Sequence, residues 1–143
     1  MKIKEALQEL ELIAQKVKPL YDNLDNLEQA DGDLELDFIR YQIRQLEDSL
    51  YNIIHTNNYL KRPVVYEGIL FKNENDRYEI EGTGHELTSG TIIEYLHHSD
   101  HYDEDYWIKA TVEHYFGDYC IVIPLKDGGN LEKDMNGLKV RVR

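Results

Sequence analysis

The sequence predicts an α+β protein in which an N-terminal antiparallel helical hairpin, similar to a coiled coil, is followed by a small β-barrel. Three observations lead to this prediction. Apolar residues recur at helical spacing before Pro63, they alternate with polar residues after it, and 143 residues amount to about one domain's worth of chain. We therefore expect a helical hairpin over residues 1–61 and a barrel domain over residues 62–143.

The first helical arm is indicated by an apolar seam that advances in alternating steps of four and three residues. The seam consists of Ile3, Leu7, Leu10, Ala14, Val17, Tyr21 and Leu24. Pro19 lies inside this arm. Because proline lacks a backbone donor and clashes with the carbonyl four residues earlier, we expect a kink or a break there.

A polar turn at residues 29–33 separates this arm from a second seam with heptad spacing. The second seam consists of Leu36, Ile39, Ile43, Leu46, Leu50, Ile53, Asn57 and Leu60. Asp31 or Asp33 can cap the second helix. Since the connection is short and the arms are similar in length, we expect them to fold back on each other.

Apolar residues of the hairpin exceed what one antiparallel partner covers. They are Leu12, Ile13, Leu20 and Leu27. Either the hairpin packs on the second half of the chain, or two chains pair into a four-helix bundle. We favour the second alternative, a homodimer through the helical hairpin.

The region after Pro63 has the period of two that is typical of strands. Candidate strands cover residues 64–72, 77–81, 91–96, 106–114, 119–124 and 138–143. In the fourth of these, Ile108, Ala110 and Val112 share one face, and Trp107 lies on the other. Short strands of this kind leave exposed edges, and closure into a small barrel is the usual way to remove them.

Four segments carry a resemblance to a known family. "RYEIEGTGHELTSGTIIEYL", "YWIKATVEH", "DYCIVIPL" and "MNGLKVRVR", within residues 76–143, resemble a family of small domains of unknown function from Gram-positive bacteria and their mobile elements, including prophages. The resemblance implies an SH3-like barrel and a mobile-element setting, and it implies no reaction. The chain departs from the family pattern in one place, where the joint between two strands is lengthened.

That joint is the stretch "YLHHSDHYDEDYW", residues 95–107. His97, His98 and His101 have spacings that could hold a metal on a helical turn. Strands are expected on both sides, however, and no cysteine lies near, so these three are weak metal candidates and we expect a solvated loop without metal. A loop whose charge responds to mildly acid conditions is a third alternative.

Charge is the strongest compositional signal. The formal net charge is −12, and residues 19–39 and 78–108 hold seven and eight acids without any Lys or Arg. Such a surface repels nucleic acid and anionic lipid and attracts basic proteins. The lone Cys120, the absence of a membrane-length apolar run and the polar N-terminus lead us to expect a cytoplasmic protein with no membrane contact.

No catalytic constellation is apparent in the sequence. Ser89 lacks the glycine of a nucleophile elbow, and the 127–132 loop lacks the ligand spacing of a calcium site. No glycine-rich phosphate loop is present either. We therefore expect a protein that is not an enzyme and that needs no cofactor.

Our main hypothesis is an acidic binding protein that docks on a basic nucleic-acid-handling protein. The most concrete form is an inhibitor of a host-defence nuclease, of the anti-restriction or anti-CRISPR type. The candidate partner-binding residues are Asp31, Asp33, Glu35, Asp37, Asp100, Asp103, Glu104, Asp105 and Trp107. The first alternative is an SH3-like peptide-binding adaptor that uses Trp107 and Tyr95 or Tyr102. The second is a barrel that binds nucleic acid through its basic C-terminal strand, which the net charge disfavours.

Overall fold

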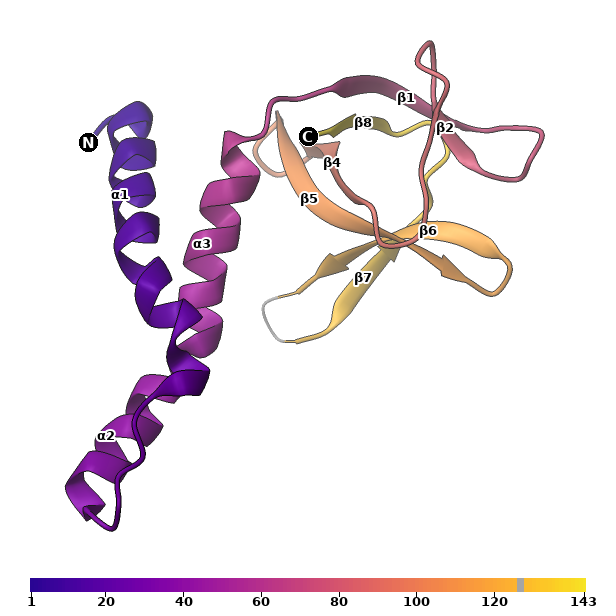
Figure 1. Cartoon of the computed structure of the whole chain (residues 1–143). Helices are drawn as coiled ribbons and strands as arrows, with labels where there is room; N and C mark the ends of the chain where they lie inside the picture. Colours follow the sequence, from indigo (N-terminus) through magenta and orange to yellow (C-terminus); the bar gives the residue numbers. More distant parts are fainter. Residues whose placement is uncertain (126–127) are drawn as a thin grey trace. The chain divides into compact units, whose positions relative to one another are not determined.

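The structure is a computed structural model that describes residues 1–125 and 128–143. The chain divides into two compact units, Met1–Arg62 and Pro63–Arg143, which we call the helical unit and the sheet unit. Figure 1 shows the elements of both. Within the described residues, no helix combines the length and the apolar character that crossing a membrane requires.

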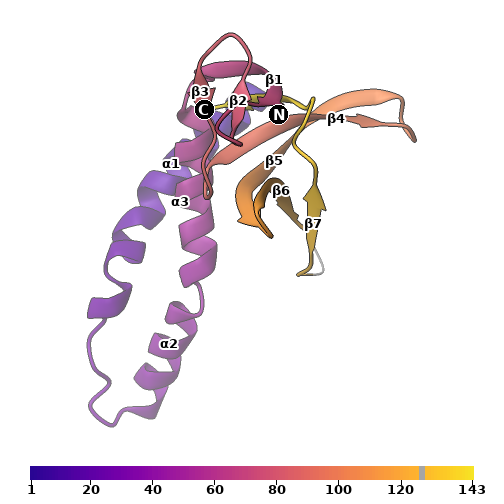
Figure 2. The same ribbon diagram turned by 90° about the vertical axis from the view of Figure 1, so that its right-hand side faces the viewer.

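The helical unit contains α1 (Ile3–Asp22), the short 3-10 helix η1 (Leu24–Asn26), α2 (Leu34–Arg44) and α3 (Glu47–Lys61). α1 and α3 pack side by side and run in opposite directions (Figures 1 and 2). Four described apolar residues of this unit are buried: Ala14 in α1, Leu24 in η1, and Leu50 and Ile54 in α3. Asn57 in α3 is buried as well. The predicted pair of N-terminal helices that pack together is thus confirmed.

The second arm is not one continuous helix, contrary to the prediction from its heptad seam. α2 ends at Arg44 and α3 begins at Glu47. At the break the Leu46 amide donates to the Ile43 carbonyl at 3.1 Å, an i to i−3 bond that tightens the last turn. No glycine or proline marks this point in the sequence, so the apolar spacing continues through it unchanged.

Of the kink or break expected at Pro19, the break is not found. α1 runs through Pro19 and ends three residues later, at Asp22. Proline inside a helix removes one backbone hydrogen bond, so the helix continues here at the loss of that bond. The Asn23 side chain satisfies one of the last carbonyls, since its Nδ2 donates to the Pro19 oxygen at 2.8 Å.

The sheet unit is one antiparallel sheet of eight strands in the order β3-β2-β1-β8-β4-β5-β6-β7. The strands are β1 (Tyr66–Lys72), β2 (Tyr78–Ile80), β3 (His85–Glu86), β4 (Ile92–Ser99), β5 (Glu104–Tyr115), β6 (Asp118–Pro124), β7 (Asn130–Lys133) and β8 (Lys139–Val142).

The sheet is not closed, so the prediction of an SH3-like barrel is wrong. Closure would require a ladder between the end strands β3 and β7, and none is formed by the described residues. β3 has only two residues, which is too short for such a ladder. The exposed edges are instead limited by the shortness of the end strands, another way in which proteins avoid edge-to-edge pairing.

β1 joins the two sections of the sheet. Tyr66–Ile69 pair with β8, and Leu70–Lys72 pair with β2. Gly68 sits where the backbone passes close to β2, since a Cβ on it would lie 3.0 Å from Ile80 Cγ2. A larger residue at this position would therefore push the two strands apart.

One face of the bent sheet carries the core. The core residues are Leu70, Tyr78, Ile80, Leu87, Ile93, Tyr95, Ala110, Val112, Ile121, Met135, Val140 and Val142. As the alternation in β5 predicts, Ala110 and Val112 are buried, while the residues between them are less so. The β5–β6 hairpin turns at Phe116 and Gly117, both with positive φ (51° and 82°), and the Phe116 side chain is fully exposed.

Candidate functional site

Four of the predicted partner-binding carboxylates lie together where the chain enters α2. Asp31 and Gly32 form a turn with positive φ angles of 48° and 87°. Asp33 then caps α2, and its Oδ1 accepts from the amides of Glu35 at 3.0 Å and Leu36 at 3.1 Å. Glu35 and Asp37 follow in the first helical turn. We call Asp31, Asp33, Glu35 and Asp37 the acidic cap.

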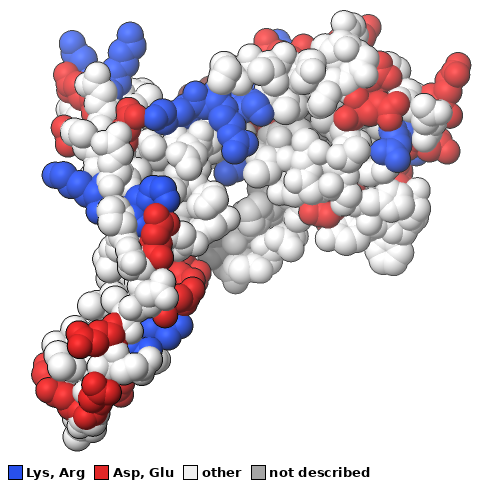
Figure 3. Space-filling model, viewed as in Figure 1, with Lys and Arg blue, Asp and Glu red and all other residues white. Residues whose placement is uncertain are grey.

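The acidic cap forms no ion pair within the described residues. Among residues 1–125 and 128–143, none of its four carboxylates lies within 4.0 Å of a basic side chain. Their charges also sit at a helix N-terminus, where the helix dipole favours them. Figure 3 shows carboxylates gathered at the α2 end of the helical unit.

An open groove of about 440 Å³ lies between α2 and the segment that precedes it. Its apolar lining is Leu27, Ala30, Leu36, Ile39 and Ile43, and its polar lining is Glu28, Gln29, Asp31, Asp33 and Arg40. We call it the α2 groove. It therefore combines an apolar floor with three carboxylates.

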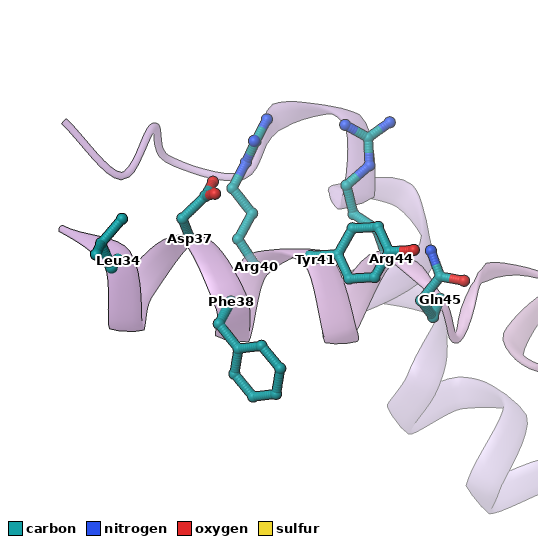
Figure 4. Close-up of a pocket in the computed structure, with 7 residues that line it drawn as sticks. All are labelled: Leu34, Asp37, Phe38, Arg40, Tyr41, Arg44 and Gln45. Atoms are coloured by element: carbon teal, nitrogen blue, oxygen red, sulfur yellow. The ribbon is translucent and has the colours of Figure 1, made fainter. Parts of the chain in front are cut away.

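The opposite side of α2 carries a second hollow, of about 630 Å³, which Figure 4 shows. Three large side chains there are exposed: Leu34 by 86%, Phe38 by 59% and Tyr41 by 60%. We call these three the outer face of α2. The α2 helix therefore has apolar side chains on two sides, those of the α2 groove and those of its outer face. None of its residues is buried.

Arg40 lines both hollows. Its Nε is buried and has no hydrogen-bond partner among the described residues. Most buried polar groups are hydrogen-bonded, because an unsatisfied donor costs about 1–3 kcal/mol. Arg40 thus carries a buried, unpartnered donor between the two hollows.

The histidine-rich stretch is mostly strand rather than loop. His97, His98 and Ser99 continue β4, Glu104 and Asp105 begin β5, and the turn covers only residues 100–103. The lengthened joint predicted from the sequence is therefore an extension of the β4–β5 hairpin.

The three histidines are separated at the end of this hairpin. His98 Nδ1 lies 2.8 Å from Asp105 Oδ1, and its Nε2 lies 3.7 Å from Asp100 and 3.6 Å from Asp103. His97 is on the other face of the strand, and its ring centroid lies 5.2 Å from that of Tyr106. Within the described part of the chain, no three metal-ligating side chains are grouped to hold an ion.

Trp107 lies on the sheet face opposite the core. It faces Leu96 across the ladder, and the Arg141 guanidinium sits 4.3 Å from its ring centroid. Arg141 and Arg143 also bind the buried Glu94, with N–O distances of 2.6 Å each. Trp107 is therefore part of a charged cluster within the sheet unit.

The structure thus divides the predicted binding residues into three places. The acidic cap belongs to the helical unit, while the carboxylates around His98 and the Trp107 cluster belong to the sheet unit. Sequence reasoning missed Arg40 and the outer face of α2. The available signal was the i, i+4, i+7 spacing of Leu34, Phe38 and Tyr41, which the heptad seam obscured.

Comparisons with known proteins cover only the sheet unit. No curated protein and no solved structure matches the chain. A family model matches residues 67–142, which excludes the helical unit with its acidic cap and α2 groove. Because this match spans more than half of the sequence, the chain belongs to the family of domains of unknown function DUF5348.

Proposed function

We propose that the protein is a non-enzymatic binding protein that docks on a basic protein through the acidic cap and the α2 groove. The observation that carries the proposal is the set of four carboxylates without an ion pair among the described residues, beside an apolar groove. Like charges held together repel one another, and a partner with clustered Lys and Arg would relieve that repulsion.

The groove specifies the chemistry of the partner more narrowly than the charge does. Leu36, Ile39 and Ile43 provide an apolar floor, which suits aliphatic side chains of a bound segment. A basic polypeptide segment with apolar anchors supplies both basic and aliphatic side chains, whereas nucleic acid would bring its phosphates against the acidic cap.

The acidic cap is a better docking surface than the end of the β4–β5 hairpin. There, Asp100, Asp103 and Asp105 each lie within 4 Å of His98. The ring of that histidine is within hydrogen-bond distance of Asp105, which therefore already has a local side-chain partner. The acidic cap has no such side-chain partner within the described residues, so its carboxylates can still form ion pairs with a second protein.

The finer proposal is that the partner handles nucleic acid. Proteins of this class present clustered Lys and Arg to phosphates, and a row of carboxylates would occupy the same surface. An inhibitor of a restriction or CRISPR nuclease fits this chemistry and the mobile-element setting that the family resemblance implies. Direct nucleic-acid binding is less favoured, because Arg141 and Arg143 are engaged by Glu94.

The adaptor alternative rests on Trp107 with Tyr95 or Tyr102, but Tyr95 is buried in the sheet core rather than exposed. The Trp107 ring is already stacked by Arg141, so it is not a free platform for a proline-rich peptide. We therefore place the binding site on the helical unit.

A defined probe tests the proposal. We would measure the fluorescence anisotropy of a labelled amphipathic helical peptide that has Leu on one face and Lys on the other. A second peptide, in which every Lys is replaced by Glu, serves as the comparison. The wild type should bind only the basic peptide, and affinity should fall steeply from about 0.05 to about 0.5 M salt because charge interactions are screened.

Two matched variants locate the site. In the first, Asp31→Asn, Asp33→Asn and Glu35→Gln neutralise the acidic cap, while the asparagine introduced at position 33 can still cap α2. In the second, Asp100→Asn, Asp103→Asn and Glu104→Gln make the same change in net charge on the sheet unit. The first should lose at least about tenfold in affinity and the second should change little. Equal losses would mean that only total charge matters, and the proposed site would be wrong.

A further inference from the structure

The outer face of α2 lies on the other side of the helix from the α2 groove, and nothing in the proposed function uses it. Leu34, Phe38 and Tyr41 follow one another at i, i+4 and i+7, so they form one stripe along the helix. More than half of each side chain is exposed. Such a contiguous apolar stripe on a helix is typical of an interaction surface.

The charges beside this stripe are ordered along the helix. Asp37 lies on one flank near the N-terminal end, and Arg44 lies on the same flank seven residues later. Figure 4 shows both on the same side of α2, with Arg40 between them. The helix is therefore acidic at its start and basic at its end along a single flank.

We propose that the outer face of α2 is a self-association surface on which two copies of the chain pair antiparallel. When two helices pack antiparallel, equivalent flanks lie beside each other in opposite directions. Asp37 of one copy then faces Arg44 of the other, and the reciprocal pair forms at the same time. Phe38 and Tyr41 of both copies lie between these pairs and cover one another, and Leu34 lies just outside them.

Charge complementarity selects this occupant and this direction. Such a two-fold contact is closed, so it yields a dimer and not a filament. Antiparallel helices also place the positive N-terminal end of each dipole beside the negative C-terminal end of the other. In a parallel two-fold pairing, this flank would instead lie beside the opposite flank of the partner, and the reciprocal Asp37–Arg44 contacts would not form.

Arg44 has a contact within its own chain that would compete. Its Nη2 lies 3.5 Å from Asp25 Oδ1, but the Asp25 side chain is 85% exposed. Exposed ion pairs contribute little, about 0–1 kcal/mol. Arg44 can therefore leave Asp25 and pair with Asp37 of a second copy at little loss of free energy.

This surface differs from the one that the sequence predicts for dimerisation. Ile13 and Leu20 on α1 are exposed by 46% and 38%, less than each member of the outer face of α2. The α2 stripe is small, so we expect a weak dimer with a dissociation constant on the order of 10–100 µM.

Sedimentation velocity over about 10–500 µM tests the proposal. The wild type should move from a monomer towards twice the 16.9 kDa chain mass as concentration rises. Asp37→Arg alone and Arg44→Glu alone should each weaken self-association at least about tenfold, because each places like charges at both contacts.

Mixing the two variants gives the decisive result. Asp37→Arg in one copy and Arg44→Glu in the other restore two opposite-charge contacts, so an equimolar mixture should form a heterodimer about as well as the wild type. The double variant in a single chain should also dimerise. Asp25→Asn is the control, and it should leave association equal or slightly stronger because Arg44 is released.

Circular dichroism of each variant should show unchanged helix content, which separates lost pairing from lost folding. A wild type that stays monomeric over the whole range would overturn the proposal. Single variants that associate like the wild type, or a mixture that does not associate, would overturn the antiparallel arrangement. Asp37 belongs to the acidic cap as well as to this surface. The variant that tests peptide binding changes Asp31, Asp33 and Glu35 and keeps Asp37, so a failure of peptide binding and a failure of self-association are distinguishable.

Discussion

The two units of this chain differ in how many of their apolar residues are buried. In the sheet unit, twelve buried residues form one core cluster on one face of the sheet. In the described helical unit, only four apolar residues are buried, and α2 buries none. Apolar side chains that fold a protein are covered by that protein, whereas those left exposed on a regular helix stripe are free to bind. We infer that the sheet unit supplies stability and the helical unit supplies contacts.

The largest expected difference between the two units appears when one apolar side chain in each is truncated. Ile93→Ala in the sheet core should cost about 3 kcal/mol, because Ile93 is 0% exposed and the cavity cannot fill. Phe38→Ala on α2 should change the free energy of unfolding by less than about 0.5 kcal/mol. Urea unfolding followed by far-ultraviolet circular dichroism measures both, and equal losses would contradict the division of roles.

A second test concerns the charged cluster of the sheet unit. Glu94→Gln should destabilise the protein by about 2 kcal/mol, since it removes the carboxylate that holds both Arg141 and Arg143. Glu94 is only 6% exposed. The exposed Glu81, which is also in the sheet unit, provides the matched control, and Glu81→Gln should have an effect near zero. A Glu94→Gln protein as stable as the wild type would mean that this cluster contributes nothing to the fold.

A third test concerns the start of α2. Asp33→Ala removes the oxygen that accepts from the Glu35 and Leu36 amides, so α2 should lose about 1 kcal/mol of local stability. Amide hydrogen exchange should speed up in α2 and stay unchanged in β4 and β5. Asp33→Asn is the control because asparagine also caps helices. Faster exchange throughout the chain would show that α2 and the sheet unfold as one cooperative unit.

The smallest effect should come from Asp118 at the β5–β6 turn. The Tyr119 amide at 2.8 Å and Lys72 Nζ at 3.1 Å hold the pKa of this carboxyl below its usual value. A depressed folded-state pKa stabilises the protein above the unfolded-state pKa, and that stability is lost as pH falls through the folded-state pKa. The stability difference between wild type and Asp118→Asn should thus be constant above about pH 4 and shrink in stronger acid.

Lys72→Gln tests which contact matters at this turn. The Tyr119 amide is the larger cause of the lowered pKa, so this variant should keep most of the acid dependence. If the dependence disappears, Lys72 rather than the backbone amide controls Asp118.

Local periodicity was sufficient to predict the elements that repeat a simple pattern. The alternation of Ile108, Ala110 and Val112 fixes which face of β5 is buried, because successive strand residues point to opposite sides. The α1 seam likewise predicts a helix that packs on another, and Asp33 is the cap that its position indicates.

Periodicity could not predict features that depend on distant segments. Closure of the sheet is decided by which strands lie at its ends, and the two-residue β3 gives no sequence signal. The α2 groove requires the path of residues 27–33, and the break before Glu47 carries no proline or glycine. The acids of the candidate site were visible, but their lack of neutralising partners among the described residues depends on three-dimensional distances.

The turn between β5 and β6 has a consequence for anyone who would engineer this protein. Two consecutive residues with positive φ are what a type I′ hairpin turn requires, and Asn-Gly is the sequence that suits it best. Here the first position is a phenylalanine, which is strained in that conformation and wholly exposed to water. Phe116→Asn should therefore relieve backbone strain and reduce non-specific association through an exposed aromatic side chain. Phe116 belongs neither to the described core nor to the acidic cap, so both stay unchanged.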